Sequence, residues 1–247
     1  METLVFTMEN FFEKCIAASC LFFWSLAPAS AQECNHPLGL IKNTEFVYQV
    51  TEKGKKDGTL NNKVMQQALN AEGAFVTTIK RTRVTEKKRP QSAEEFRMRC
   101  VGDTVYLDAL LLMQEQALRA FDGKNLEFVS VDVAYPHHMQ VGHALPDARL
   151  EVKVNSQSAS ISNLHMAAVN RKVEDRQTVT TPAGTFDCFK VTYQYVVRLD
   201  ALGIDTENIF NVEEYYSTEH GIIKVQFTTL KGKKSKGMEL LSKKSRI

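Results

Sequence analysis

The sequence predicts one mainly β domain, built from about ten or eleven antiparallel strands and one substantial α-helix. Three observations support this fold class. Apolar and polar side chains alternate with period two along most of the chain, short turns rich in Gly and Asn separate these runs, and one segment of strong helix formers interrupts them. No proline-rich or low-complexity linker divides residues 32–247, so a single domain is expected there.

The first half of the chain alternates most clearly at Phe46, Tyr48 and Val50, whose side chains would share one face of a strand. Polar turns at 53–58 and 70–73 then separate strands, and Gly102-Asp103 forms a hairpin turn. The strands expected in this half are 46–50, 59–69, 74–79, 96–100 and 104–107.

The segment 108–121 breaks the period-two pattern and predicts the helix. It is rich in Leu, Ala, Gln and Glu, Asp108 is a plausible N-cap, and Gly123 follows its end. Its apolar stripe consists of Leu110, Met113, Ala117 and Phe121.

The second half returns to alternation and contains the sharpest hairpin signal, Thr181-Pro182-Ala183-Gly184. Pro182 presets φ for a type I turn, and Gly184 tolerates positive φ at the following bulge. After this turn, apolar side chains line one face of a long strand at Phe189, Val191, Tyr193, Tyr195 and Val197. The other strands expected in this half are 125–131, 148–154, 159–175, 206–217, 221–230 and 237–242.

Residues 1–31 are expected to be a cleaved secretory signal peptide. The apolar run from Cys15 to Leu26 spans about a dozen residues, which is short for a membrane span. Ala29-Ser30-Ala31 supplies the small residues of a cleavage site. The leader is unusually acidic, and Met8 is an alternative start to Met1. An N-terminal anchor is the competing interpretation; export predicts a protein of the periplasm, the outer membrane or the cell exterior.

Three cysteines remain after residue 31, namely Cys34, Cys100 and Cys188. An oxidising compartment allows one internal disulfide among them and leaves one thiol. Cys34 lies on the N-terminal tail of the mature chain and could reach either Cys100 or Cys188, so both pairings stay open. Buried thiols that act as small apolar groups are the alternative.

Enzymatic motifs are not found, and no catalytic residue, cofactor or metal site is expected. The sequence holds neither a G-x-S-x-G elbow nor a glycine-rich phosphate loop. His137, His138 and His143 lie close together, but they belong to a segment with Pro136 and Pro146 that reads as a crossing loop. Glu213 and Glu214 are strand neighbours that would point to opposite faces, which makes them a poor acid/base pair.

The formal net charge is +2, and basic residues gather at 80–89 and 231–246. These runs read mainly as solvated turns and as edge-strand lysines that discourage aggregation. Contact with an anionic membrane surface is the functional alternative. No nucleic-acid partner is expected outside the cytoplasm.

Several segments together resemble one bacterial family. They are F-V-Y-Q-V at 46–50, F-R-M-R-C-V-G-D-T-V-Y-L-D at 96–108, V-G-H-A-L-P-D-A at 141–148, N-R-K-V-E at 170–174, the hairpin 178–191, and E-E-Y-Y-S-T-E-H-G-I-I-K at 213–224. In this order they resemble the exported proteins grouped as domain-of-unknown-function family 3108 and their TapB-like relatives. The resemblance implies an exported, mostly β protein of unestablished activity. It also implies a single curved antiparallel sheet or open half-barrel, similar to periplasmic lipoprotein carriers.

These observations favour a non-enzymatic envelope protein that binds lipid or another amphipathic small molecule on the concave side of its sheet. The residues expected to contact the ligand come from the helix and from the strand after Gly184: Leu110, Met113, Phe121, Phe189, Tyr193 and Tyr195. The alternative is a rigid β scaffold that docks to an outer-membrane or secretion assembly. A scaffold would show an exposed apolar or basic patch and no internal cavity.

Overall fold

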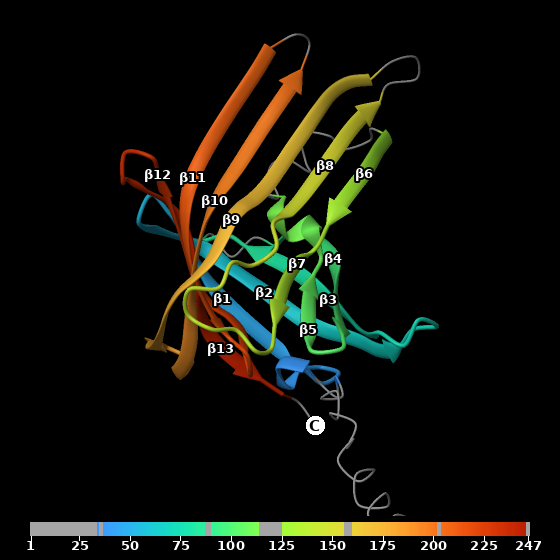
Figure 1. The fold of residues 1–247 in the computed structure, drawn as a ribbon, viewed down its shortest axis with the longest axis vertical. Helices are drawn as coiled ribbons and strands as arrows, with labels where there is room; N and C mark the ends of the chain where they lie inside the picture. The colour runs from blue at the N-terminus through green and yellow to red at the C-terminus, as the bar shows by residue number, and fades with distance from the viewer. Residues whose placement is uncertain are drawn as a thin grey trace, which may run out of the picture. The chain divides into compact units, whose positions relative to one another are not determined.

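The computed structural model describes residues 34, 37–86, 90–113, 125–155, 160–201 and 204–245, and residues Cys34–Ile247 form one compact unit. The expected signal peptide lies outside the described residues. Thirteen strands form a single antiparallel sheet (Figure 1). They are β1 (Glu45–Glu52), β2 (Lys55–Leu69), β3 (Phe75–Val84), β4 (Pro90–Val101), β5 (Thr104–Leu107), β6 (Asn125–Val131), β7 (Val133–Pro136), β8 (Ala148–Asn155), β9 (Ser160–Thr181), β10 (Gly184–Ala201), β11 (Ile204–Ser217), β12 (Gly221–Thr229) and β13 (Lys234–Lys244).

The sheet curves into an almost closed barrel, because its two edge strands are consecutive in the chain. The strand order is β6-β8-β9-β10-β11-β12-β13-β1-β2-β3-β4-β5-β7, so β6 and β7 form the edges and only Asp132 separates them. β6 pairs with β8 and β7 pairs with β5, so one interrupted strand joins the two ends of the sheet. The Asp132 carboxylate holds this seam by accepting from Arg99 Nη2 (2.6 Å) and from the Ala109 backbone N–H (3.2 Å).

The expectation of one antiparallel sheet is confirmed, but the expected number of strands is too low. The clearest omission is β7, which lies inside the segment read as a crossing loop. Val133, Ala134 and Tyr135 are all buried, so this strand of only four residues shows no alternation. A period-two search therefore cannot find it.

The expected helix 108–121 is wrong in its described part. Asp108 does cap a turn, since its Oδ1 accepts from the Leu110 N–H at 2.9 Å. The turn is the short 3-10 helix η2 (Ala109–Leu112), and Met113 is already extended. Ala109 and Met113 are buried against the sheet, which indicates that tertiary packing overrides the helix propensity of this segment. Residues 114–121 lie outside the described residues.

A bulge in β9 controls which side chains face inward. Ala167–Val169 pair in register with β10, but Gln194 pairs with Val169 and Thr192 with Lys172, so Asn170 and Arg171 together oppose Tyr193. Asn170 has φ +57, as the bulged residue. Before the bulge the buried residues of β9 include the even positions Leu164, Met166 and Ala168, together with Ala167; after it they include the odd positions Arg171 and Val173.

The hairpin at 181–184 forms as the sequence predicts. β9 ends at Thr181, β10 begins at Gly184, and the two residues pair across the turn. Gly184 has φ +137, a conformation that L side chains rarely adopt, which explains the glycine at this position.

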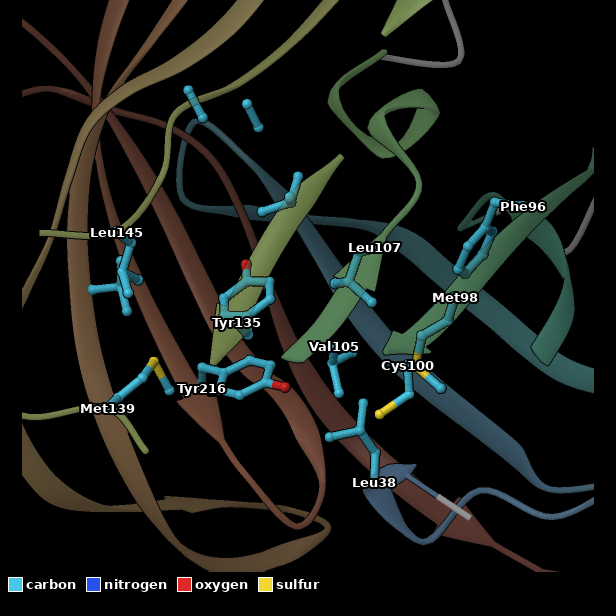
Figure 2. Close-up of a cluster of buried hydrophobic side chains, with 14 of the residues drawn as sticks. Leu38, Phe96, Met98, Cys100, Val105, Leu107, Tyr135, Met139, Leu145 and Tyr216 are labelled. Carbon is cyan, nitrogen blue, oxygen red and sulfur yellow. The ribbon is translucent and has the colours of Figure 1, made fainter. Parts of the chain in front are cut away.

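The interior holds three buried apolar clusters, of which Figure 2 shows the largest. This cluster joins Phe96, Met98 and Cys100 of β4 to Tyr135 of β7 and Tyr216 of β11. The rings of Tyr135 and Tyr216 stack at 4.1 Å with an interplanar angle of 6°. The second cluster brings Ala109 and Met113 against β8, β9 and β10.

Candidate functional site

A cavity of about 200 Å³ lies inside the barrel. Most of its wall is apolar and comes from strands across the whole sheet and from η2: Val50, Leu60, Leu107, Leu111, Leu112, Met113, Val133, Ala168, Ile222, Val225, Phe227 and Met238. The polar part of the wall consists of Tyr135, Tyr193, Tyr195 and Glu214, together with Arg81, Arg83, Glu94 and Lys236. An apolar cavity with a few converging polar groups is the usual form of a small-molecule site.

Three of the six residues expected to contact a ligand line this cavity, namely Met113, Tyr193 and Tyr195. Leu110 is half-buried and packs against the second apolar cluster instead. Phe189 packs against the first cluster, with the Arg176 guanidinium 5.3 Å from its ring centre. Phe121 lies outside the described residues. The tyrosine hydroxyl of Tyr195 donates to the Leu112 carbonyl and thereby ties η2 to β10.

Glu214 is the most unusual member of the cavity wall, because it is a carboxyl group only 3% exposed. Alternation along β11 explains its position: Val212, Glu214 and Tyr216 are buried, while Glu213 points outward and binds Lys190 Nζ at 2.6 Å. Inside, Tyr135 Oη donates to Glu214 Oε1 at 2.5 Å and Tyr193 Oη donates to Oε2 at 3.2 Å. Burial raises the pKa of the Glu214 carboxyl, while Arg171 and the two tyrosine hydrogen bonds oppose that rise.

Arg171 supplies the positive charge near Glu214. The β9 bulge turns its side chain inward, where it is 1% exposed and lies 4.9 Å from the centre of the Tyr135 ring. Its Nη1 donates to the carbonyls of Ala134 (3.0 Å) and Pro146 (2.8 Å). Within the described part of the chain, Nε and Nη2 have no hydrogen-bond partner. Its positive charge opposes the rise in the pKa of the Glu214 carboxyl group that burial causes.

The loop before β8 fixes the Arg171 backbone by pairing with β9. Backbone bonds join Leu145 N–H to the Arg171 carbonyl (2.8 Å) and Val173 N–H to the His143 carbonyl (2.9 Å). The Asp147 carboxylate accepts from the Asn170 N–H at 2.9 Å. The segments 141–148 and 170–174, which carry separate parts of the family resemblance, therefore form one structural unit around a buried arginine.

The model of the DUF3108-like family matches residues 43–240. The chain belongs to this family. No curated protein matches the sequence at a significant level. The match to the DUF3108-like model spans both β9–β13 and the N-terminal half of the sheet, so it includes every described residue of the cavity wall.

Two crystal structures are similar in fold to this DUF3108-like chain. A candidate lipoprotein from Parabacteroides distasonis aligns with a TM-score of 0.67 at 16% identity and covers 83% of this chain and 96% of its own. A candidate exported protein with a YmcC-like fold from Bacteroides fragilis aligns with a TM-score of 0.62 at 16% identity, covering 83% of this chain and 97% of its own. At this identity the likeness concerns the fold alone.

A second polar region of the cavity wall belongs to β3, β4 and β13. Arg81 and Glu94 are cross-strand partners, and Arg81 Nε donates to Asn62 Oδ1 at 3.1 Å while its guanidinium lies 4.8 Å from the Phe96 ring centre. Arg83 forms an ion pair with Asp57. This part of the wall carries more positive than negative side chains.

The described histidines do not gather at one site. In the described part of the chain no group of three or more His, Cys, Asp or Glu side chains is placed to hold a metal ion. His137 and His138 contact each other at the surface, His165 lies 3.7 Å from Glu151, and His220 lies beside Phe186 and Lys243.

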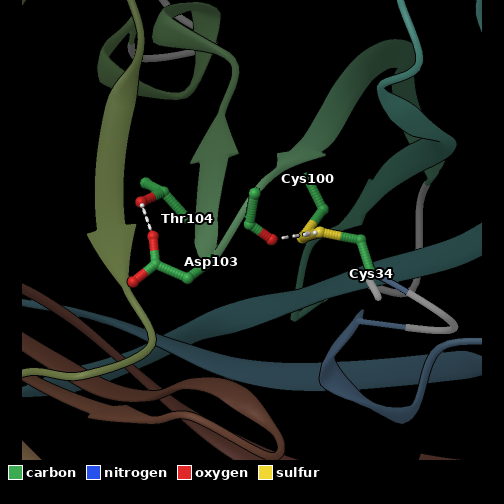
Figure 3. The surroundings of a disulfide bond; sticks show 5 residues. Cys34, Cys100, Asp103 and Thr104 are labelled. Carbon is green, nitrogen blue, oxygen red and sulfur yellow. Dashed lines mark hydrogen bonds between the residues drawn. A yellow bond between two sulfur atoms is a disulfide. The ribbon is translucent and has the colours of Figure 1, made fainter. Parts of the chain in front are cut away.

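The structure joins Cys34 to Cys100 by a disulfide, one of the two pairings that the sequence left open (Figure 3). Their Cα atoms are 5.8 Å apart. Cys188 is a free thiol with no exposed surface. Burial, and to a lesser extent Asp187, raises its pKa to about 12, so the thiol is protonated at neutral pH and is a poor nucleophile.

Proposed function

We propose that this DUF3108-like protein is an exported, non-enzymatic binding protein whose barrel cavity holds an apolar or amphipathic small molecule. The cavity of about 200 Å³ carries this proposal, because its wall is mainly apolar and includes four aromatic side chains, Tyr135, Tyr193, Tyr195 and Phe227. A mainly apolar pocket with a few polar groups is the usual form of a site for a small apolar or amphipathic molecule.

Export is supported by three independent features. The leader at 1–31 has the pattern of a secretory signal. The Cys34–Cys100 disulfide suits an oxidising compartment. The two similar crystal structures come from proteins described as a candidate lipoprotein and a candidate exported protein. Among the described residues, no helix is long and apolar enough to cross a membrane.

Native mass spectrometry of residues 32–247, purified gently from their own envelope, tests the binding function. We expect a discrete adduct on the wild-type protein. Val225→Phe places a ring in the cavity, where Val225 is 4% exposed, and should abolish the adduct. Val129→Phe adds the same ring at a site that is 51% exposed and serves as the matched control. A bare wild-type mass, or an adduct that survives Val225→Phe, contradicts the proposal.

The scaffold function remains a second candidate because of one observation on β6. This edge strand is paired only with β8, and it exposes Phe128, Val129 and Val131 by 47%, 51% and 41%. An exposed apolar edge is a template for strand addition by a partner chain. Crosslinking in the native envelope should then capture one specific protein through β6, and Val129→Lys should abolish that crosslink. The internal cavity favours ligand binding over this alternative.

A further inference from the structure

We propose that one end of the barrel, formed by the β1–β2 and β12–β13 turns, is a surface that binds an anionic phospholipid bilayer through its lysines and inserts Leu230. This inference concerns a surface outside the cavity and holds whether or not the cavity takes up a ligand. It follows from the charge that the fold gathers on these two turns and from the exposed leucine among the lysines.

The two turns are far apart in the sequence but adjacent in the structure (Figure 1). β1 pairs with β13, which places Glu52 opposite Lys236, and the Lys53 backbone N–H donates to the Ser235 carbonyl. The fold thereby joins two short basic runs into one surface, which we call the lysine patch. Its members are all exposed, and they are Lys53, Lys55, Lys56, Lys231, Lys233 and Lys234.

The lysine patch carries an excess of positive charge. The carboxylates that flank the first turn in the sequence are Glu52 and Asp57, and Asp57 forms an ion pair with Arg83. Glu86 lies just past the end of β3, whose Val84 pairs with Thr59 of β2. Among the described residues, no ion pair joins a lysine of the patch to a carboxylate. Six lysines therefore face only a few acidic groups, which suits an anionic surface.

Protection of a sheet edge does not explain the lysine patch. Lysines that discourage aggregation belong on edge strands. The edges of this sheet are β6 and β7, whereas β12, β13, β1 and β2 are consecutive strands of its interior. The expectation that the lysines of the second basic run protect an edge is therefore wrong for residues 231–234.

Leu230 adds an apolar group to the lysine patch. It directly precedes Lys231 and is 61% exposed. Hydrogen bonds within the turn hold this segment in place, since Gly232 N–H donates to the Thr229 carbonyl (2.8 Å) and Thr229 N–H donates to the Lys233 carbonyl (2.9 Å). At a bilayer surface the leucine can enter the boundary between headgroups and acyl chains while the lysines contact anionic headgroups.

The lysine patch also lies close to one part of the cavity wall. Lys236 and Gly237, which follow Ser235 in β13, line the cavity, and so does Val50 of β1. A bilayer bound at the patch would therefore lie within a few residues of the cavity along the same strands.

Co-sedimentation of residues 32–247 with large unilamellar vesicles tests the proposal. We expect binding to phosphatidylcholine vesicles that contain about 30% phosphatidylglycerol, and no binding to phosphatidylcholine alone. Added salt should release the protein, because it screens exposed charges. Each lysine near an anionic bilayer contributes roughly fivefold to the partition coefficient, so replacing Lys231, Lys233 and Lys234 together with Gln should lower it by about 100-fold.

A second triple variant controls for net charge. Replacing Lys42, Lys153 and Lys244 with Gln removes the same charge from exposed lysines elsewhere, and Lys244 ends β13 roughly 30 Å from Lys234. This variant should keep the partition coefficient of the wild type within about threefold, because only the overall field of the protein changes.

One pair of variants tests the apolar contact. Leu230→Gln should lower the partition coefficient by about tenfold, because the bilayer no longer buries the leucine side chain. Ile204→Gln is the matched control, since Ile204 is 67% exposed at the start of β11, six residues before the Phe210 that pairs with Thr229. It should leave vesicle binding unchanged.

Several results would overturn the proposal. They are equal binding to neutral and anionic vesicles, an equal loss in the two lysine triples, and an equal effect of Leu230→Gln and Ile204→Gln. Absence of vesicle binding also overturns it, and heparin binding through the same lysines would then identify an anionic polymer as the partner. The cavity adduct expected in native mass spectrometry is measured without vesicles, so either proposal can fail without the other.

Discussion

Replacing Arg171 with Met should destabilise the protein more than any substitution of a surface arginine. Methionine keeps much of the apolar stem but removes the guanidinium, which is 1% exposed. The carbonyls of Ala134 and Pro146 then lose their donor, at about 1–3 kcal/mol for each buried unsatisfied group. Glu214 also loses a nearby positive charge that opposes the rise in the pKa of its carboxyl group.

Two effects limit the loss caused by Arg171→Met. The Nε and Nη2 donors have no partner in the described structure, so their removal recovers part of a desolvation cost. Glu214 can also protonate, because burial has already raised the pKa of its carboxyl group. We therefore expect the free energy of unfolding to fall by about 3 kcal/mol at pH 8, mainly because two buried carbonyl groups lose their donor.

The loss of stability caused by Arg171→Met should be smaller at low pH than at high pH. Without Arg171 the folded-state pKa of Glu214 rises further above the unfolded value of about 4.3. Between those two pKa values the folded state binds more protons than the unfolded state, so lowering the pH stabilises the variant. The deficit relative to wild type should thus be smaller at pH 5 than at pH 8.

Urea unfolding of residues 32–247 at both pH values measures this effect. Arg176→Met is the matched control, since Arg176 is an exposed arginine of the same strand that pairs with Asp187, and it should leave the urea midpoint unchanged. A deficit below about 1 kcal/mol for Arg171→Met, or an equal deficit at pH 5 and pH 8, would refute the coupling of Arg171 and Glu214.

Three further predictions concern stability and local dynamics. Gly58→Ala should lower the free energy of unfolding, measured by chemical denaturation, by at least about 2 kcal/mol. Gly58 has φ +105, and a Cβ there would lie 2.1 Å from the Val84 carbonyl oxygen. Gly73→Ala is the control and should cause a smaller decrease, because the surroundings of Gly73 are open. Cys34→Ser removes a disulfide with a sequence separation of 66 and should lower the free energy of unfolding by about 3–4 kcal/mol. Dithiothreitol should lower the free energy of unfolding of the wild type by the same amount and leave that of the variant unchanged. Tyr195→Phe removes the hydrogen bond to the Leu112 carbonyl, so amides of Ala109–Met113 should exchange faster with deuterium while those of β9 stay unchanged.

Much of the fold could be predicted from the sequence because most strands have one face inside the barrel and one outside. Side chains on such strands therefore alternate between apolar and polar with period two. Glycine is found at turns where φ is positive. The pattern fails at β7, where three successive residues are buried, and at η2, where local helix propensity competes with packing of Ala109 and Met113. Both failures occur next to the seam at Asp132, where the two ends of the sheet meet.

The candidate site was predictable only in part, for similar physical reasons. Tyr193 and Tyr195 were found because β10 alternates without interruption through the cavity. Phe189 also lies at an odd number, but it is four residues before Tyr193, roughly 13 Å along the strand, and does not line the cavity. The signal for Glu214 was present, since it is flanked at i ± 2 by Val212 and Tyr216, and only its charge argued against an inward position.

Arg171 could not have been found by counting alternate residues. Counting from Leu164, Met166 and Ala168 assigns inward positions to even numbers and places Arg171 outside. The bulge at Asn170 reverses the parity, and the reversal is held by contacts to a loop some 25 residues earlier in the chain, through the Asp147 carboxylate and the Pro146 carbonyl. The two segments 141–148 and 170–174 are therefore both needed to turn the Arg171 side chain inward. Because the charge of Arg171 opposes the rise in the pKa of the Glu214 carboxyl group, this loop affects the electrostatics of the cavity although none of its residues lines the cavity wall.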